Sequence, residues 1–484
     1  MISSNAFTYS RHEAIVSASL DGFHISVPKK PKMDVVFQWK DVLGASTGQD
    51  SALGGENMPL TVHVFEKHKN GKRRLRDVVL TSSNGASGTD QHDVECWLKV
   101  IQYFACPMRD PEAVMPTLDE IIQKPPKQRK FLVLINPIGG TGKGEKTFEK
   151  IRPILMNANI LIEKVTTERA QHAVDIAENF DLTAYDCIVV VGGDGFAYEV
   201  IQGFMKRKDW ADAIRFPFGV IPAGSGNGLA KTMAEAAGEL CLPENCTYFL
   251  AKGKPLELDL ATLRTTSFYS ISYTVVGNPK ESSFIFLSLS WAFLAEVDIE
   301  SEKYRYLGSQ RFTFATIAKI MSSKGWNGKF TYLEAPEDDI VPNYWDLTEN
   351  HGQAPQVSLL PAFGELPKEG WKTIEGAFSL FWAMNVSHAA LDAHVAPMAK
   401  LNDGHIYVVI MEGKATKGDY LNVMLALEKG QHIEKPCVKV IKTRAFELET
   451  PEGDLLSADG ERYAGGLCQV EVHRGMARVM GILK

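Results

Sequence analysis

Residues 131–144 read Phe-Leu-Val-Leu-Ile-Asn-Pro-Ile-Gly-Gly-Thr-Gly-Lys-Gly, and this stretch decides the fold class. Its first five residues are an apolar run of strand length, which Asn136-Pro137 ends. Similar runs recur at 187–191 and 218–221, and helical patterns separate the three. Buried strands that alternate with helices indicate a parallel sheet with helices on both faces. We therefore predict an α/β nucleotide-binding lobe over residues 129–262.

The first strand ends in a glycine-rich turn, Asn136 to Gly144. Glycines let backbone N–H groups approach phosphate oxygens, and the helix that follows offers its positive N-terminus. The turn is not a Walker A motif, because Gly144 stands where Ser or Thr should follow the Gly-Lys pair. By itself the pattern fits a phosphate site and a ligand-free tight turn equally well.

The second strand ends in Gly192-Gly193-Asp194-Gly195. Asp194 is the only reactive side chain among these glycines, and a carboxylate can accept the proton of an alcohol during phosphoryl transfer. The alternative is an aspartate that caps the next helix. Glu199 follows Asp194 by five residues, on the helix that begins here. It could contact ATP, or it could be a charged residue on the surface.

The third strand ends in Pro222-Ala223-Gly224-Ser225-Gly226-Asn227, which offers two glycines, a hydroxyl and an amide. Ligands of open α/β sheets bind beyond the carboxyl ends of the strands. The three turns should therefore converge on one site.

The rest of the chain divides into regions of different composition. Residues 10–106 read as a β-rich module with a hairpin at Asp21-Gly22 and a closing helix at 90–104. This order of elements resembles a pleckstrin-homology fold. A basic, proline-containing linker at 124–130 follows. Residues 263–471 predict a mainly antiparallel β lobe, with a long loop at 335–372, and residues 472–484 are expected to return to the first lobe.

Composition excludes several classes of protein. The net charge of −7 argues against general nucleic-acid binding. Seven scattered cysteines without a C-x-x-C pattern argue against a disulfide framework or zinc site and favour the cytoplasm. The N-terminus lacks the apolar core of a signal peptide, and the longest apolar run, 284–297, is too short to span a bilayer. A lipid substrate would thus require peripheral contact with a membrane.

The three turns, in this order and spacing, resemble the catalytic domain of the diacylglycerol kinase superfamily. Residues 290–308, Ser-Trp-Ala-Phe-Leu-Ala-Glu-Val-Asp-Ile-Glu-Ser-Glu-Lys-Tyr-Arg-Tyr-Leu-Gly, look specifically like sphingosine kinases, as do Thr167-Glu168-Arg169 and Asp459-Gly460-Glu461. The resemblance runs from about residue 129 to the C-terminus, apart from 335–372. It implies transfer of the ATP γ-phosphate, with Mg²⁺, to the primary hydroxyl of a sphingoid base, giving sphingosine 1-phosphate.

The resemblance also implies roles for individual residues. Asp194 would be the general base, within a substrate-side turn formed with Gly192, Gly193 and Gly195. Asp298 would hold the cationic head of the lipid, and Phe293, Leu294, Val297 and Phe312 would line the slot for its alkyl chain. The nucleotide would be surrounded by Asn136, Pro137, Ile138, Gly139, Gly140, Gly142, Lys143, Thr167, Glu168, Arg169, Glu199, Gly224, Ser225, Gly226, Arg305, Arg311, Asp459, Gly460 and Glu461.

Several alternatives stay open at this point. Many sphingosine kinases have serine at the position of Gly192. Glycine at this position is also common in ceramide and diacylglycerol kinases. Ile138 replaces a residue that is often basic. Asp298 could form a surface salt bridge, and the apolar residues near it could be ordinary core. A lipid-binding scaffold without activity is the alternative outside enzymes, and an intact Asp194 argues against it.

A basic cluster, Lys67 to Arg76, surrounds Asn70-Gly71. It predicts either a solvated hairpin tip or a contact with anionic lipid. A linker follows the β-rich module, which indicates that the module is a separate unit. We therefore expect residues 1–124 to be dispensable for catalysis when the substrate is dissolved in detergent micelles.

Overall fold

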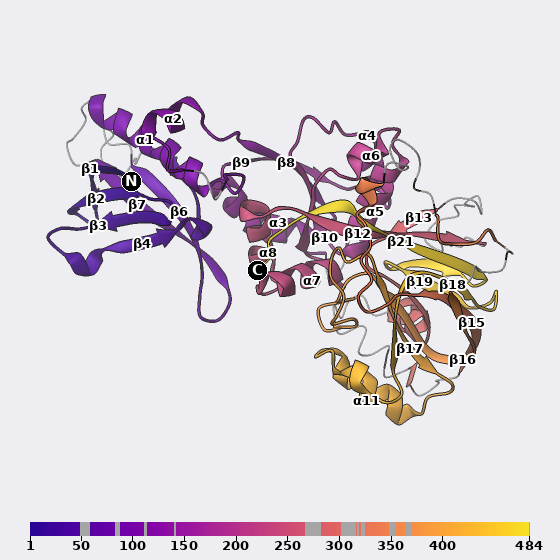
Figure 1. Cartoon of the computed structure of the whole chain (residues 1–484). Coiled ribbons are helices and arrows are strands. Elements are labelled where there is room, and N and C mark those ends of the chain that lie inside the picture. Colours follow the sequence, from indigo (N-terminus) through magenta and orange to yellow (C-terminus); the bar gives the residue numbers. More distant parts are fainter. Residues whose placement is uncertain are drawn as a thin grey trace.

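The computed structural model describes residues 1–48, 59–82, 88–110, 114–139, 142–266, 282–301, 325–347 and 370–483, with 316, 319–320, 355, 357–363 and 365. Three regions follow one another along the chain (Figure 1).

The N-terminal module is a seven-stranded antiparallel sheet in the order β4-β3-β2-β1-β7-β6-β5, closed by helix α1 (Gly88–Ala105). Its core includes Trp39 stacked on Phe104, with ring centroids 4.9 Å apart. The predicted start at residue 10 is wrong, because the first strand already pairs within this sheet. Sequence analysis also missed the short helix α2 (Leu118–Gln123). The strands are β1 (Ile2–Tyr9), β2 (His12–Ala18), β3 (Gly22–Ser26), β4 (Val35–Gln38), β5 (Val42–Thr47), β6 (Leu60–Lys67) and β7 (Arg73–Ser82).

The nucleotide lobe contains four strands in parallel register. The apolar runs noted in the sequence form three of them, and their side chains are almost completely buried between helices. The strands are β8 (Arg129–Ile135), β9 (Ile160–Thr166), β10 (Cys187–Gly192) and β11 (Phe218–Pro222). The helices are α3 (Gly144–Asn157), α4 (His172–Asn179), α5 (Asp194–Lys206), α6 (Trp210–Ala213), α7 (Gly228–Ala237) and α8 (Pro243–Lys252).

The second lobe is mainly antiparallel, as predicted. Sequence analysis missed its helix α11 (Lys417–Leu427). Helix α9 (Phe293–Ser301) also lies in this lobe. The strands are β12 (Lys254–Thr265), β13 (Ser283–Ile285), β14 (Ser288–Ala292), β15 (Trp326–Glu334), β16 (Trp371–Met384), β17 (Ile406–Glu412), β18 (Lys439–Glu449), β19 (Leu455–Ala458), β20 (Glu461–Ala464) and β21 (Leu467–Gly481).

Strand β21 joins the two lobes. It pairs antiparallel with β12 along most of its length and with β18 at its start, and near its end Val479 pairs in parallel with Phe218 of β11. The sheet is therefore continuous from one lobe into the other. Because strands cannot slide without breaking this ladder, the glycine turns and the β lobe are held in a fixed relation.

The module also packs against the nucleotide lobe. Leu43 and Phe65 of the module belong to the same buried core as the strands of that lobe. The Lys252 ammonium, at the end of α8, donates to the carbonyls of Val42 and Ala105, and burial lowers the pKa of Lys252 to about 7. These contacts make the module part of one packed body.

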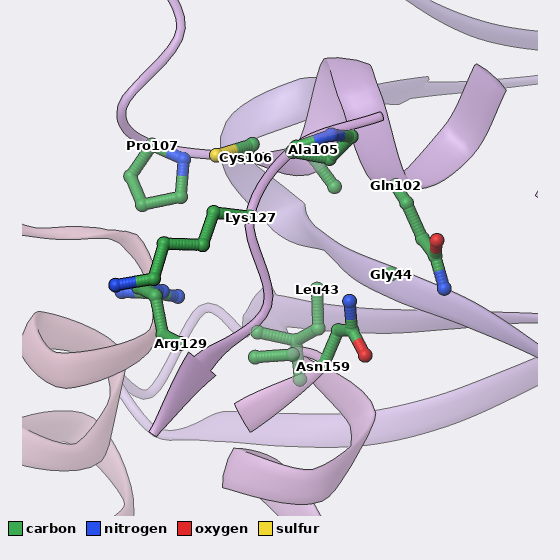
Figure 2. Close-up of a pocket in the computed structure, with 11 residues that line it drawn as sticks. Leu43, Gly44, Gln102, Ala105, Cys106, Pro107, Lys127, Arg129 and Asn159 are labelled. Carbon is green, nitrogen blue, oxygen red and sulfur yellow. The ribbon is translucent and has the colours of Figure 1, made fainter. Parts of the chain in front are cut away.

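A small pocket lies at this junction, between module, linker and lobe. Figure 2 shows Gly44 and Gln102 from the module, with Lys127 and Arg129 from the linker and β8, around it. None of the residues that line it belongs to the glycine turns, and we assign it no ligand.

Part of the basic cluster contacts the lobe that follows the module. Arg73 is buried and pairs with Asp41 of the module and Glu239 of the nucleotide lobe, at 3.0 Å each. Lys67 lies 3.5 Å from the same Glu239. The solvated hairpin tip is therefore wrong for Arg73, whereas Lys67, Lys69, Lys72, Arg74 and Arg76 are exposed, and their contact with anionic lipid stays a prediction.

Candidate active site

The first glycine turn is shaped by Asn136. Its side-chain oxygen accepts the N–H groups of Ile138 (3.0 Å) and Gly139 (2.8 Å), which folds the chain back after β8. A Cβ atom at Gly144 would lie 2.4 Å from the Asn136 carbonyl oxygen, so α3 can begin there only with glycine. Gly140 lies outside the described residues.

The second and third turns touch each other. The parallel register places Gly192 beside Pro222, and the Ala223 N–H donates to the Gly192 carbonyl at 2.9 Å. A Cβ atom at Gly224 would lie 2.3 Å from Cα of Gly193. These glycines are therefore needed for backbone contact between turns, whether or not they also face a ligand.

Asp194 lies where these two turns meet, and its side chain is buried. Its two carboxylate oxygens accept the N–H groups of Gly228 (2.7 Å) and Leu229 (3.1 Å) at the start of α7. Burial raises the pKa of Asp194, and the backbone N–H donors oppose that rise. The aspartate thus does stabilise a helix end, but that of α7 rather than of its own helix α5. The backbone N–H groups of Asn227 and of Asp194 itself also interact with this carboxylate.

A second buried carboxylate, Asp459, lies on the other side of the lobe junction. It accepts the N–H groups of Phe286, Leu287 and Ser288 at 2.8–3.0 Å, which fixes the turn between β13 and β14. Burial raises the pKa of Asp459 to about 7, and the charge of Asp194 contributes to this rise. The predicted nucleotide contact of Asp459 stays a prediction, and the structure adds this structural role.

Helix α5 carries further groups across the junction. Glu199 accepts the Ala173 N–H at 3.2 Å, and burial raises its pKa to about 7, with Glu461 adding to the effect. The hydroxyls of Tyr198 on α5 and Tyr463 on β20 lie 3.0 Å apart. Sequence analysis missed this tyrosine pair, although Tyr198 stands one helical turn after Asp194 and so lies on the same face.

Comparison with known proteins agrees with this architecture. Residues 130–263 match the family model described as diacylglycerol kinase catalytic domain, and residues 373–481 match the YegS C-terminal NAD kinase beta sandwich-like domain. Sphingosine kinase 1 of Arabidopsis thaliana is 32% identical over 70% of each chain. Sphingosine kinase 1 of Homo sapiens is 32% identical over 72% of this chain and 90% of its own. This chain belongs to the sphingosine kinase family.

A solved structure supports the fold alone. It is of a proposed diacylglycerol kinase from Bacillus anthracis str. Sterne, with a TM-score of 0.50 and 18% identity, and it covers 73% of this chain and 97% of its own.

Several other residues predicted to contact nucleotide lie in or beside the first turn. Thr167 is buried and bonds through its N–H and hydroxyl to the Ile135 carbonyl, at 2.9 and 3.2 Å. Glu168, Arg169 and Lys143 are exposed. Ile138 is also exposed, at 79%, although it is apolar.

The predicted lipid-binding residues divide into two groups. The first group is buried in the hydrophobic core of the second lobe and consists of Phe293, Leu294 and Val297. The ring centroids of Phe293 and Tyr420 lie 4.5 Å apart. Asp298 lies in α9, and its side chain is outside the described residues, as are Arg305, Arg311 and Phe312.

No group of three or more His, Cys, Asp or Glu side chains that could hold a metal ion occurs in the part of the chain that the structure describes. The oxygens of Asp194 and Asp459 already accept backbone N–H groups.

Proposed function

We propose that this chain is an ATP-dependent kinase that phosphorylates the primary hydroxyl of sphingosine or a related sphingoid base. Its membership of the sphingosine kinase family carries this conclusion. The local chemistry supports it, because a buried carboxylate, Asp194, lies where two glycine-rich turns of one sheet meet.

In the reaction, the Asp194 carboxylate accepts the proton of the lipid hydroxyl while that oxygen forms a bond to the γ-phosphorus. The bond from the γ-phosphorus to the ADP oxygen breaks, and ADP leaves. Burial favours this role, since it raises the pKa of Asp194 toward the working pH and makes the carboxylate a stronger base. The N–H groups of α7 hold the carboxylate in place.

Several finer assignments belong to the same proposal. ATP occupies the first and third turns over residues 129–262, the lobe of 263–471 holds the lipid, and Mg²⁺ enters with the phosphates of ATP. Asp298 faces the cationic amine, because a partly desolvated amine needs a carboxylate partner. Gly460 and Glu461 close the nucleotide site.

The module is proposed to be pleckstrin-homology-like, and the enzyme to contact membranes peripherally from the cytoplasm. In support of the first point, seven antiparallel strands are closed by one C-terminal helix. No helix among the described residues has both the length and the apolar character needed to cross a bilayer.

Phosphate transfer from labelled ATP to sphingosine, ceramide and diacylglycerol, each in the same detergent micelles, tests the proposal. We expect sphingosine to be the preferred acceptor. Preference for ceramide or diacylglycerol would replace the substrate assignment, and inactivity on all three would favour a lipid-binding scaffold.

A further inference from the structure

Helix α7 connects the proposed base to the N-terminal module. Its first turn donates the N–H groups of Gly228 and Leu229 to the Asp194 carboxylate. Its last residue is Ala237, after which Gly238 adopts the left-handed conformation, with φ of +63°. Ten residues at 1.5 Å rise make the helix about 15 Å long.

The far end of α7 is held by the hairpin of β6 and β7. Glu239, directly after Gly238, is buried, and one of its oxygens accepts two bonds from the Arg73 guanidinium, at 3.0 and 3.3 Å. Its other oxygen accepts the Asn245 amide at 2.8 Å. Lys67 donates to the Gly238 carbonyl. The end of the helix therefore has a charged partner on the module.

Arg73 itself is fixed in position. Its guanidinium also donates to Asp41 (3.0 Å) and to the Phe65 carbonyl (2.8 Å), and it lies 3.5 Å from the ring centre of Tyr248. A planar guanidinium bonded on several sides cannot shift without breaking buried hydrogen bonds. The module thus presents a rigid contact to α7.

We propose that Arg73 is a positioning residue for Asp194: through Glu239 and helix α7, the N-terminal module sets the place of the carboxylate that accepts the substrate proton. This inference rests on the proposed function of Asp194. It gives the module a role in chemistry that does not depend on membranes.

A helix is stiff along its axis, so a shift at Glu239 reaches Gly228 and Leu229. Hydrogen bonds weaken steeply with distance and angle, and a misplaced base slows proton transfer. Weaker N–H donors also stabilise the charged carboxylate less, which raises its pKa. Besides the N–H groups of Asn227, Gly228, Leu229 and Asp194 itself, the charged group that acts on this carboxylate across the junction is Asp459.

The experiment compares two full-length variants that each remove one carboxylate partner of Arg73. Glu239→Gln breaks the contact with the end of α7, whereas Asp41→Asn breaks a contact within the module. Hydrogen exchange read by mass spectrometry reports on the amides of the first turn of α7, and kcat/KM for sphingosine is measured against pH.

For Glu239→Gln we expect faster exchange at the start of α7, and an acid limb of the pH profile moved to higher pH. We also expect kcat to fall by about 2- to 30-fold, the range for mutations that act through a packed network. Asp41→Asn leaves the bonds from Arg73 to Glu239 in place, so it should change the exchange at α7 and the acid limb of the pH profile much less. If Glu239→Gln does not fold, Lys67→Met at the same helix end takes its place, with the same expected directions.

Unchanged exchange and an unchanged acid limb in the α7-end variant would overturn the proposal. Equal changes in both variants would also overturn it, since general loosening of the module would then explain them. A wild-type enzyme inactive on sphingosine would refute the proposed function instead, while the exchange comparison would still test the mechanical link.

Discussion

At the scale of single residues, the carboxylate of Asp194, which we propose accepts the substrate proton, also holds the start of α7. Asp194→Asn should lower kcat by about 10²–10⁴-fold, the usual contribution of a general base. The amide must also turn its NH₂ toward one backbone N–H, so we expect a loss of about 1–3 kcal/mol in the free energy of unfolding. Steady-state kinetics and denaturant unfolding measure the two effects.

Asp259→Asn is the matched control for this variant. Asp259 is also buried and accepts two backbone N–H groups, from Gly404 at 2.6 Å and Gly475 at 2.7 Å, but it lies in β12 and outside the glycine turns. The Asp259→Asn enzyme should therefore be less stable than the wild type but have the same kcat. Near-normal turnover in Asp194→Asn would remove the base role.

A second prediction at this scale concerns Asp298 in α9. Loss of one partner of a partly buried charge pair costs on the order of 2–5 kcal/mol. Asp298→Ala should therefore cut kcat/KM for sphingosine by about 30-fold or more, at 1.36 kcal/mol per tenfold. Residual activity on a neutral lipid alcohol, measured in the same micelles, should change far less. An equal loss on both substrates would assign Asp298 to the nucleotide site or to the fold.

At the scale of elements, helix α5 ties the base to the second lobe. Besides the Tyr198–Tyr463 contact, the Gln202 side chain exchanges two hydrogen bonds with the Phe284 backbone, at 2.7 and 3.2 Å. Tyr463 lies on β20, next to the segment that we propose closes the nucleotide site. Loss of its partner in Tyr198→Phe should therefore raise KM for ATP by a few fold. The lost hydrogen bond should also lower the free energy of unfolding by about 1 kcal/mol. ATP titrations and thermal unfolding check both values.

The double variant Tyr198→Phe with Tyr463→Phe should lose less than the sum of the single losses, because the hydroxyls share one contact. Tyr420→Phe is the control, since its hydroxyl donates to the Ser379 carbonyl at 3.1 Å within one lobe. It should change stability but leave KM for ATP unaltered. Strict additivity of the pair would mean that the two hydroxyls act independently.

At the scale of the whole molecule, the module packs against the lobe that follows it, and these contacts favour the opposite of the expectation that residues 1–124 are dispensable. Removing them deletes the Arg73 partner of Glu239 and exposes to water the apolar surface on which Leu43 and Phe65 pack, so the remaining chain loses stabilising burial. A chain that starts at residue 125 should therefore unfold at lower temperature and lose most of its activity even on micellar sphingosine. Calorimetry and a micelle assay measure this. Full activity with an unchanged midpoint of thermal unfolding would show that the rest of the chain folds and works without the module.

The sequence by itself determined the three buried strands, their glycine turns and Asp194, because apolar runs that end in glycine leave few ways to fold and because the motifs identify the family. It could not reveal what Arg73 and Lys67 contact, since Glu239 lies more than 160 positions away and charge patterns do not encode distant partners. For the same reason only the tertiary structure joined Tyr198 to Tyr463, Asp459 to the turn before β14, and the module to helix α7. Motifs of neighbouring residues can be recognised in the sequence. Contacts between residues far apart in the chain form only when the packed core brings their segments together, so they cannot be predicted in this way.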